Sequence, residues 1–297
     1  MMSRAQIELL PDGRRLYLHD GPIDLIIEAF GRVSEIQAAY HAATQRFVTV
    51  LDELCGELAI LRQPFCGDGP RPTGRVAKRM TSAVAPYASQ TFITPMAAVA
   101  GAVAEEILEA MTSAADLQRA YVNDGGDIAL HLGKGQEFTV GMVERPDRPS
   151  LFGSAILPSD QPIRGIATSG WRGRSFSLGI ADAVTVLADR AAMADAAATI
   201  TANAVDLPGH PGIMRMRARD LSPDSDLRDR LVTRGVGNLA ISEIGSALDA
   251  GKAMAQSLLS AGLMRAAALY LQGETRLVGQ PHGMLKITKC NGSLVNA

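Results

Sequence analysis

The sequence predicts an α+β protein in which long helices pack on a mostly antiparallel sheet. Residues 33–61 carry apolar side chains at helical spacing, which is typical of a long amphipathic helix. The middle of the chain consists of short segments rich in β-forming residues, at a spacing typical of an antiparallel meander. Long helices over a mostly antiparallel sheet define the α+β class.

The composition is that of an ordinary globular chain. Its 297 residues include 47% apolar and 20% charged side chains, with a net charge of −2. This charge gives no electrostatic reason to bind nucleic acid or a membrane surface, and 4% aromatic residues argue against base stacking. The length allows one large domain or two smaller ones. Without an exact repeat or a long linker, we expect a single domain over 1–297, or two closely packed lobes.

The cysteines and the apolar segments predict a cytoplasmic protein. Cys55, Cys66 and Cys290 are widely spaced, and no zinc-ligand or disulfide pattern includes them. The first residues lack the apolar core of a signal peptide, and no apolar stretch is long enough to span a membrane.

The first part of the chain predicts a hairpin followed by helices. Residues 5–22 hold two short strands around a Pro-Asp-Gly turn. A proline- and glycine-rich loop covers 62–74. The hydroxyl of Thr94 and the proline after it predict a helix start. Helical spacing predicts helices over 33–61, 75–88 and 96–111. The first half of the last helix is so rich in alanine and glycine that we expect another backbone to approach it closely.

The second part predicts the sheet and two further helices. Strands are expected over 127–132, 137–143, 150–157, 163–170, 175–181 and 182–188. An alanine-rich helix is expected over 190–204, a charged loop and helix over 222–237, and a helix over 241–262. A final strand pair is expected over 264–279.

The segment "VNDGGDIAL" is the first candidate site. Gly125 and Gly126 allow positive φ or a close approach to a ligand, and Asn123, Asp124 and Asp127 bring hydrogen-bonding oxygens. The same residues suit a tight turn whose Asn and Asp satisfy their own backbone. Both interpretations stay open at this point.

The segment "GIATSGWRGR" is the second candidate. Thr168, Ser169 and Gly170 end a strand with small hydroxyl residues, and Arg172 and Arg174 follow. Amides, hydroxyls and guanidiniums together suit phosphate oxygens. The alternative is a polar hairpin tip with solvated arginines.

The alanine-rich helix over 190–204 holds the third candidate. Asp195 and Thr199 are four residues apart, so they share one helix face. Both offer the hard oxygen ligands that magnesium takes alongside phosphate. Such residues on a surface helix would be solvated, but the alanine flanks indicate burial, and a buried aspartate needs a partner.

A basic stretch near the glycine- and proline-rich loop could face an anion. A solvated loop is the alternative. The charged residues concerned are Asp68, Arg71, Arg75, Lys78 and Arg79.

Two isolated residues have open roles. His131 suits a satisfied core histidine as well as a general base, and Cys66 is a candidate nucleophile without a base nearby in sequence.

The three candidate motifs occur in one order: "VNDGGDIAL", "GIATSG" and "DAVTVLADRAAMADAAAT". This ordered set resembles the ApbE-like superfamily, whose best-known members are FAD:protein FMN transferases. Other segments, "PMAAVAGAVAEE", "DLRDRLVT" and "ALYLQG", look closer to an uncharacterised bacterial and archaeal branch. The resemblance covers most of the chain from about Arg75 onward.

The resemblance implies an ApbE-type α+β fold, related to the T-fold, with a cleft for a flavin nucleotide such as FAD or FMN. Asp195 and Thr199 would hold magnesium at the pyrophosphate. In the transferase reaction a threonine hydroxyl of an acceptor protein attacks that pyrophosphate and AMP is released. The residues expected to line the cofactor are Asn123, Gly125, Gly126, Asp127, Thr168, Ser169 and Gly170.

The chain departs from the transferases between the second and third motifs. Their histidine-containing "SHIIDP-x-TG"-like segment is replaced by "WRGRSFSLGIADA", in which Asp182 is a candidate for the family's aspartate. No catalytic residue is therefore assigned.

Three functions follow from this comparison. The leading hypothesis is an ApbE-like protein that binds a flavin or related phosphorylated heterocycle, with magnesium-dependent FMN transfer as its activity. The alternatives are an enzyme of pterin-type or other redox-cofactor biosynthesis, or a non-catalytic cofactor-binding or assembly protein. Alanine-rich helix faces suggest a homodimer.

Overall fold

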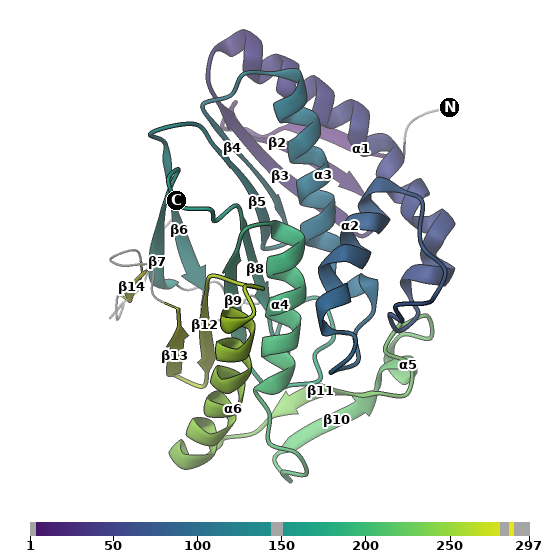
Figure 1. Ribbon diagram of the computed structural model, residues 1–297, viewed down its shortest axis with the longest axis vertical. Helices are drawn as coiled ribbons and strands as arrows, with labels where there is room; N and C mark the ends of the chain where they lie inside the picture. The colour runs from purple at the N-terminus through teal and green to yellow at the C-terminus, as the bar shows by residue number, and fades with distance from the viewer. Residues whose placement is uncertain (1–3, 144–150, 280–284, 288–297) are drawn as a thin grey trace. The chain divides into compact units, whose positions relative to one another are not determined.

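The computed structural model describes residues 4–143, 151–279 and 285–287 (Figure 1). The chain forms two compact units, each made of discontinuous segments. The first comprises Met1–Glu137, Pro158–Ala167 and Ala188–Ala196, and the second comprises Phe138–Leu157, Thr168–Leu187 and Ala197–Ala297. The expectation of one domain or two closely packed lobes stays a prediction.

The first unit is built on an antiparallel sheet with two helices on one face. Alternate residues are buried in β2 and in β3 as far as Ile27, which is why one face of this sheet packs against helices. Helices α1 and α3 both contact the sheet and each other (Figure 1). The strands are, in pairing order, β1 (Gln6–Leu9), β2 (Leu16–Asp20), β3 (Ile23–Phe30), β4 (Arg119–Asp124), β5 (Asp127–Leu132) and the start of β8 (Gly165–Ser169).

The helices of the first unit follow the predicted periodicity. Helix α1 spans Val33–Leu61, as expected, and α2 spans Arg75–Val84. Pro86 removes a backbone donor, so α2 gives way to a 3-10 turn over Ala85–Tyr87. Helix α3 spans Val99–Ala114.

The expected start of α3 is wrong in its details. Thr94 precedes a short 3-10 helix, Pro95–Ala98, and its side chain does not cap it. The α-helix begins only at Val99, where an aspartate from another helix, Asp195, accepts the Gly101 amide. A distant carboxylate thus performs the capping that the local sequence assigned to a threonine.

The close backbone approach expected at α3 is confirmed at Gly101. A Cβ atom built there would lie 2.4 Å from the carbonyl oxygen of Ala191, at the start of α4 (Ala191–Ala204). No rotamer change can relieve such a contact, because backbone atoms form it.

Replacement of Gly101 by alanine is expected to destabilise the protein. Overpacking of this kind lowers the free energy of unfolding by about 1–3 kcal/mol. The matched control is Gly56→Ala in α1, where an added Cβ meets no described atom within 4 Å. Since alanine is the better helix former, the control should be stabilised by about 0.5–1 kcal/mol. Urea denaturation measures both, and a loss in both variants would contradict the proposed contact.

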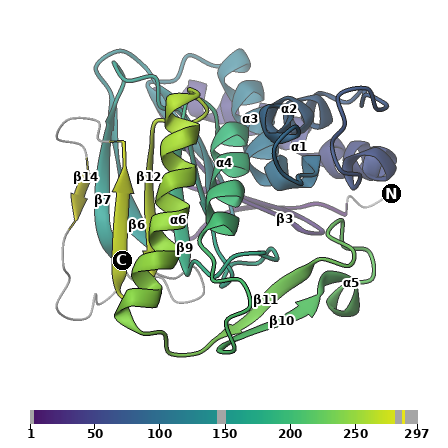
Figure 2. The same cartoon turned by 60° about the horizontal axis from the view of Figure 1, so that its bottom comes forward.

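The second unit contains a second antiparallel set of strands. Helix α6 (Ile241–Ser260) packs on β12 and β13 (Figure 2). The main strands are β9 (Ala183–Ala188), β12 (Ala266–Leu271) and β13 (Glu274–Val278), with β12 between the other two. A three-stranded sheet holds β6 (Glu137–Val143), β7 (Leu151–Pro158) and β14 (Leu285–Ile287). A separate two-stranded ribbon pairs β10 (Ile213–Arg217) with β11 (Leu231–Val236), and the short helix α5 (Ala218–Leu221) follows β10.

The α+β class with antiparallel pairing and long helices is confirmed. The expected meander is wrong, because β6 and β7 leave the run to pair in their own sheet. The expected charged helix over 222–237 is also wrong, since β11 lies there.

The strand expected over 175–181 does not form. Gly179 packs directly on the end of α4, where an added Cβ would lie 2.0 Å from the Ala202 carbonyl oxygen. The Leu178 amide donates to the Asn203 side chain at 2.9 Å. This segment therefore bonds to the end of a helix and is not part of a sheet ladder.

Among the described residues, no helix is both long and apolar enough to cross a membrane.

Candidate functional site

The Gly-Gly pair forms the two-residue turn between β4 and β5. Gly125 and Gly126 have φ of 62° and 115°, which favours glycine at both positions. Asp124 and Asp127 face each other across the turn, and the Asn123 side-chain oxygen accepts the Gly126 amide at 2.8 Å. The turn interpretation is confirmed, and it accounts for Asn123 and both glycines without a ligand. Contact of these residues with a dinucleotide stays a prediction.

Asp195 extends from α4 to the amino end of α3. Its carboxylate accepts the Gly101 amide at 3.0 Å and is also bonded to the Ala100 amide. These are backbone donors that a helix start leaves unsatisfied. Burial raises the pKa of Asp195 to about 7, and the nearby carboxylate of Asp124 adds to this rise. Asp124 is itself only 4% exposed, so its charge acts on Asp195 from a buried position.

Glu105, on α3, caps the amino end of α4 in the same way. Its carboxylate accepts the Ala192 amide at 2.9 Å and pairs with Arg190 at 2.6 Å. Helix α3 therefore supplies a carboxylate to the start of α4, and α4 supplies Asp195 to the start of α3. Each of these two negative carboxylates is stabilised by the positive end of the helix dipole beside it.

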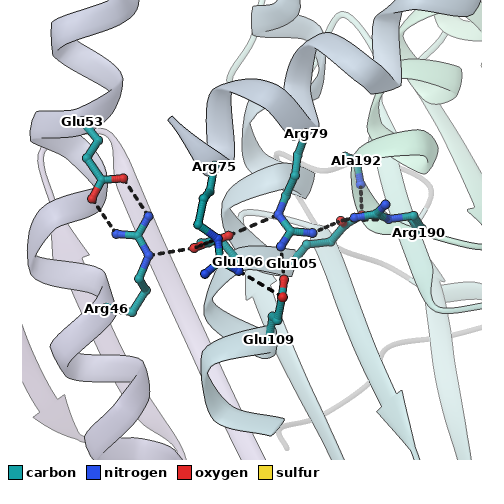
Figure 3. A network of polar contacts seen from close by, with 9 residues as sticks. All are labelled: Arg46, Glu53, Arg75, Arg79, Glu105, Glu106, Glu109, Arg190 and Ala192. Carbon is teal, nitrogen blue, oxygen red and sulfur yellow. Dashed lines mark hydrogen bonds and ion pairs between the residues drawn. The ribbon is translucent and has the colours of Figure 1, made fainter. Parts of the chain in front are cut away.

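Glu106, the neighbour of Glu105, is the centre of an ion-pair network (Figure 3). Its side chain is 1% exposed and lies 2.8 Å from Arg46, 3.3 Å from Arg75 and 3.2 Å from Arg79. The network, which holds four arginines and four glutamates, joins α1, α2, α3 and the start of α4. Its charged members are Arg46, Arg75, Arg79, Arg190, Glu53, Glu105, Glu106 and Glu109.

From Thr168 onward the second candidate motif lies in the second unit, where two of its residues bond to Asp182. The buried Asp182 carboxylate accepts hydrogen bonds from the Trp171 indole at 3.1 Å, from Arg172 at 2.5 Å and from the backbone N–H of Gln272 at 2.8 Å. The Arg172 guanidinium also lies 4.3 Å over the Trp171 ring. Arg172 is thus neither the solvated arginine nor the free phosphate ligand that the sequence suggested.

The small residues of this motif are packed rather than open. The Thr168 hydroxyl is 2.9 Å from that of Thr185 on β9. Gly170 has φ of 155°, and an added Cβ would lie 2.6 Å from the Asp182 carbonyl oxygen. Contact of Thr168, Ser169 and Gly170 with a cofactor stays a prediction.

Thr199 follows Asp195 by one turn on α4, in the part of the helix that belongs to the second unit. In the described ranges, no group of three His, Cys, Asp or Glu side chains is arranged to hold a metal. The magnesium site at Asp195 and Thr199 stays a prediction.

His131 is satisfied by its surroundings. Its Nε2 lies 3.1 Å from the Leu117 carbonyl oxygen, which favours the core interpretation over a general base.

The structure joins one pair of sequence-predicted segments within a unit. The "NDGGD" turn and Asp195 both belong to the first unit, and the charge of Asp124 acts on Asp195 there. Sequence reasoning missed Glu105 and Glu106, although a signal was present. Two adjacent glutamates inside an alanine-rich, buried helix need partners.

A family model described as "AbpE bacteria" matches residues 7–277. A UPF0280 protein of Methanopyrus kandleri is 38% identical over 128 residues, or 43% of this chain and 48% of the relative. One from Methanosphaerula palustris is 32% identical over 196 residues, which cover 61% of this chain and 73% of the relative. The chain spans about half the length of the relatives from Methanopyrus kandleri and Methanococcoides burtonii, 48% and 55% respectively.

Among solved structures, the apo form of the Pseudomonas stutzeri flavinyl transferase ApbE aligns with 11% identity and a TM-score of 0.41. This alignment covers 96% of this chain and 94% of that one. The family model extends over nearly the whole chain, and the archaeal relatives are UPF0280 proteins, so the family predicted from the three motifs is confirmed. The chain belongs to the AbpE bacteria family and is a relative of the archaeal UPF0280 proteins.

Proposed function

We propose that this protein binds a flavin nucleotide such as FAD, or a related phosphorylated heterocycle, together with magnesium. The observation that carries the proposal is the hold of the Asp195 carboxylate on the amino end of α3, where the buried carboxylate of Asp124, next to the Gly-Gly turn, adds its negative charge. The ordered motifs shared with FAD:protein FMN transferases supply the ligand class.

The residues present fit a magnesium ion. Magnesium is usually held by one or two carboxylates, with phosphate and water completing its ligands. The raised pKa of Asp195 shows that its anion is disfavoured where it lies, and a cation beside it would restore the charged form. Thr199 would add a hydroxyl oxygen from the next turn of the helix.

Bound magnesium would neutralise charge at the pyrophosphate of the nucleotide. The chain's own residues would bind and orient the cofactor. Asp195 is fixed by its bonds to α3, and the glycines at 125 and 126 let the turn backbone approach a phosphate or ring closely. Transfer of FMN to an acceptor protein is the activity we propose for this site.

A second candidate, cofactor binding without transfer, is favoured by one observation. Asp182, the candidate for the family's aspartate, already accepts from Trp171, Arg172 and Gln272. Because three donors already occupy this carboxylate, a substrate group could reach it only by displacing one of these hydrogen bonds. The segment that replaces the family's histidine therefore has a structural role in this chain.

The test measures the unfolding temperature with FAD, with FMN and without either, each with and without magnesium. We expect FAD to raise the unfolding temperature only when magnesium is present, and Asp195→Ala to abolish that rise. Asp68→Ala, in an exposed loop, is the control and should respond as the native chain does. Absence of any response to FAD and FMN would contradict the proposal.

Release of AMP then separates the two candidates. AMP formed from FAD in the presence of an acceptor protein supports transfer, whereas a magnesium-dependent shift without AMP supports binding alone.

A further inference from the structure

A groove beside α2 shares no residue with the site proposed above. It has a volume of about 450 Å³ and lies between the loop over 62–74 and one face of α2. We call it the α2 groove. The residues that matter for the argument are Phe65, Cys66, Arg71 and Pro72 from the loop, and Lys78, Thr81 and Ser82 from the helix.

Helix α2 presents two kinds of basic residue to different neighbours. Arg75 and Arg79 pair with the glutamates of α3. Lys78, Thr81 and Ser82 follow a spacing of three and four residues, so they form a separate stripe, and this stripe lines the groove. A third face is buried in the core and consists of Val76, Ala77, Met80, Ala83 and Val84.

The positive charge of the groove is not held in ion pairs, although the carboxylate of Glu57, outside the lining, interacts with Lys78 through its charge. Neither Arg71 nor Lys78 forms an ion pair with any described residue, and of the described residues no acidic one lines the groove. Asp68 is exposed in the same loop but is not part of the lining. The Thr81 hydroxyl donates to the Ala77 carbonyl at 2.8 Å. Ser82 is therefore the hydroxyl left to donate to a ligand.

Both ends of the loop are fixed, so the groove is preformed. The Phe65 amide donates to the Ile93 carbonyl at 2.9 Å. At the other end, Glu57 accepts the amides of Thr73 and Gly74 at 2.6 and 3.2 Å. Burial alone would raise the pKa of Glu57, but these hydrogen bonds and the charge of Lys78 lower it overall. A preformed site loses little conformational entropy on binding.

We propose that the α2 groove binds a phosphorylated small molecule. A phosphate monoester carries close to two negative charges at neutral pH, which match Arg71 and Lys78, whereas a carboxylate would neutralise only one of them. Ser82 donates to a phosphate oxygen. The organic part of the ligand lies against Phe65 and Pro72, and the volume is in the usual range for small-molecule pockets.

Cys66 provides a reporter for occupancy, because it is exposed and lines the groove. The alkylation rate of each cysteine in the full chain is followed by mass spectrometry with iodoacetamide. The probes are phenyl phosphate, inorganic phosphate and benzoate. We expect phenyl phosphate to protect Cys66 at the lowest concentration and benzoate to protect it least. Cys55, exposed on α1 outside the groove, should keep its rate throughout.

Variants identify the charges responsible. Lys78→Gln and Arg71→Gln should each weaken the protection by about tenfold, the effect of losing one charge-assisted hydrogen bond. Lys134→Gln, an equal charge change at an exposed site, should leave it unchanged. The proposal would be overturned if none of the probes slowed the alkylation of Cys66 by iodoacetamide. It would also be overturned if the protection in Lys78→Gln were as strong as in the native chain. Isothermal titration calorimetry with phenyl phosphate should rank the native chain and these variants in the same order of affinity.

Two variants distinguish a failure of the α2 groove proposal from a failure of the proposed flavin site. Asp195→Ala should retain the protection of Cys66, and Lys78→Gln should retain the magnesium-dependent response to FAD. Loss of Cys66 protection in Asp195→Ala would count against an independent groove.

Discussion

Replacement of Glu106 by glutamine is expected to lower the free energy of unfolding by about 3 kcal/mol, the cost of breaking a buried ion pair from one side. The Glu106 carboxylate is 1% exposed and faces Arg46, Arg75 and Arg79. A neutral amide keeps the size of the side chain but leaves these guanidiniums with unbalanced positive charge, and its own N–H groups point toward other donors. Urea denaturation at neutral pH gives the value.

Glu53→Gln is the matched control for this prediction. Glu53 bonds to Arg46 at the edge of the same network, but its side chain is 41% exposed. Water can replace its contacts, so the loss should stay below about 1 kcal/mol. Equal losses in the two variants would show that burial of Glu106 does not determine its contribution.

Replacement of Asp195 by asparagine is expected to stabilise the protein at pH 8 and to remove the magnesium-dependent response to FAD that we propose. Burial and the Asp124 carboxylate raise the pKa of Asp195 to about 7. The amide keeps an acceptor for the Gly101 N–H group and removes the disfavoured charge. A site that binds a cation in this way costs the protein stability when the cation is absent.

The pH dependence of this effect has a defined sign. An unfolded aspartate titrates near pH 4, so between about pH 4 and 7 the folded state binds the extra proton and the native protein loses stability as the pH rises. Above pH 7 the loss is complete. The stability difference between Asp195→Asn and the native chain should therefore grow from pH 4 to pH 7 and then stay level. Thermal unfolding across this range measures it, and a constant difference would contradict the raised pKa.

Local sequence patterns predicted the two longest helices well. The bounds of α1 follow from an unbroken apolar periodicity, and α6 follows from the same signal. Strands β3 and β10 were not predicted. In β3 the run Ile26–Ile27 interrupts a clean alternation. Strand β10 alternates apolar residues with arginines, and it lies just before the stretch 222–237 that was expected to form a charged loop and helix.

The candidate site was predictable only in part, for a physical reason. The turn residues Asn123 to Gly126 are neighbours in sequence, and their mutual bonds follow from local chemistry. The approach of Asp195 to Gly101 and Asp124 depends on how separate helices and strands pack, which no local pattern encodes. The same holds for the three donors around Asp182, which come from two separate parts of the chain.

The charge-balanced network of Figure 3 also constrains how this sequence can change over generations. Loss of any one of its buried members leaves an opposite charge without compensation, and the penalty is larger than a marginally stable protein easily tolerates. Descendants can leave this arrangement only through paired substitutions, one arginine together with one glutamate. We therefore expect positions 46, 79, 105 and 106 to covary among relatives that have lost part of the network.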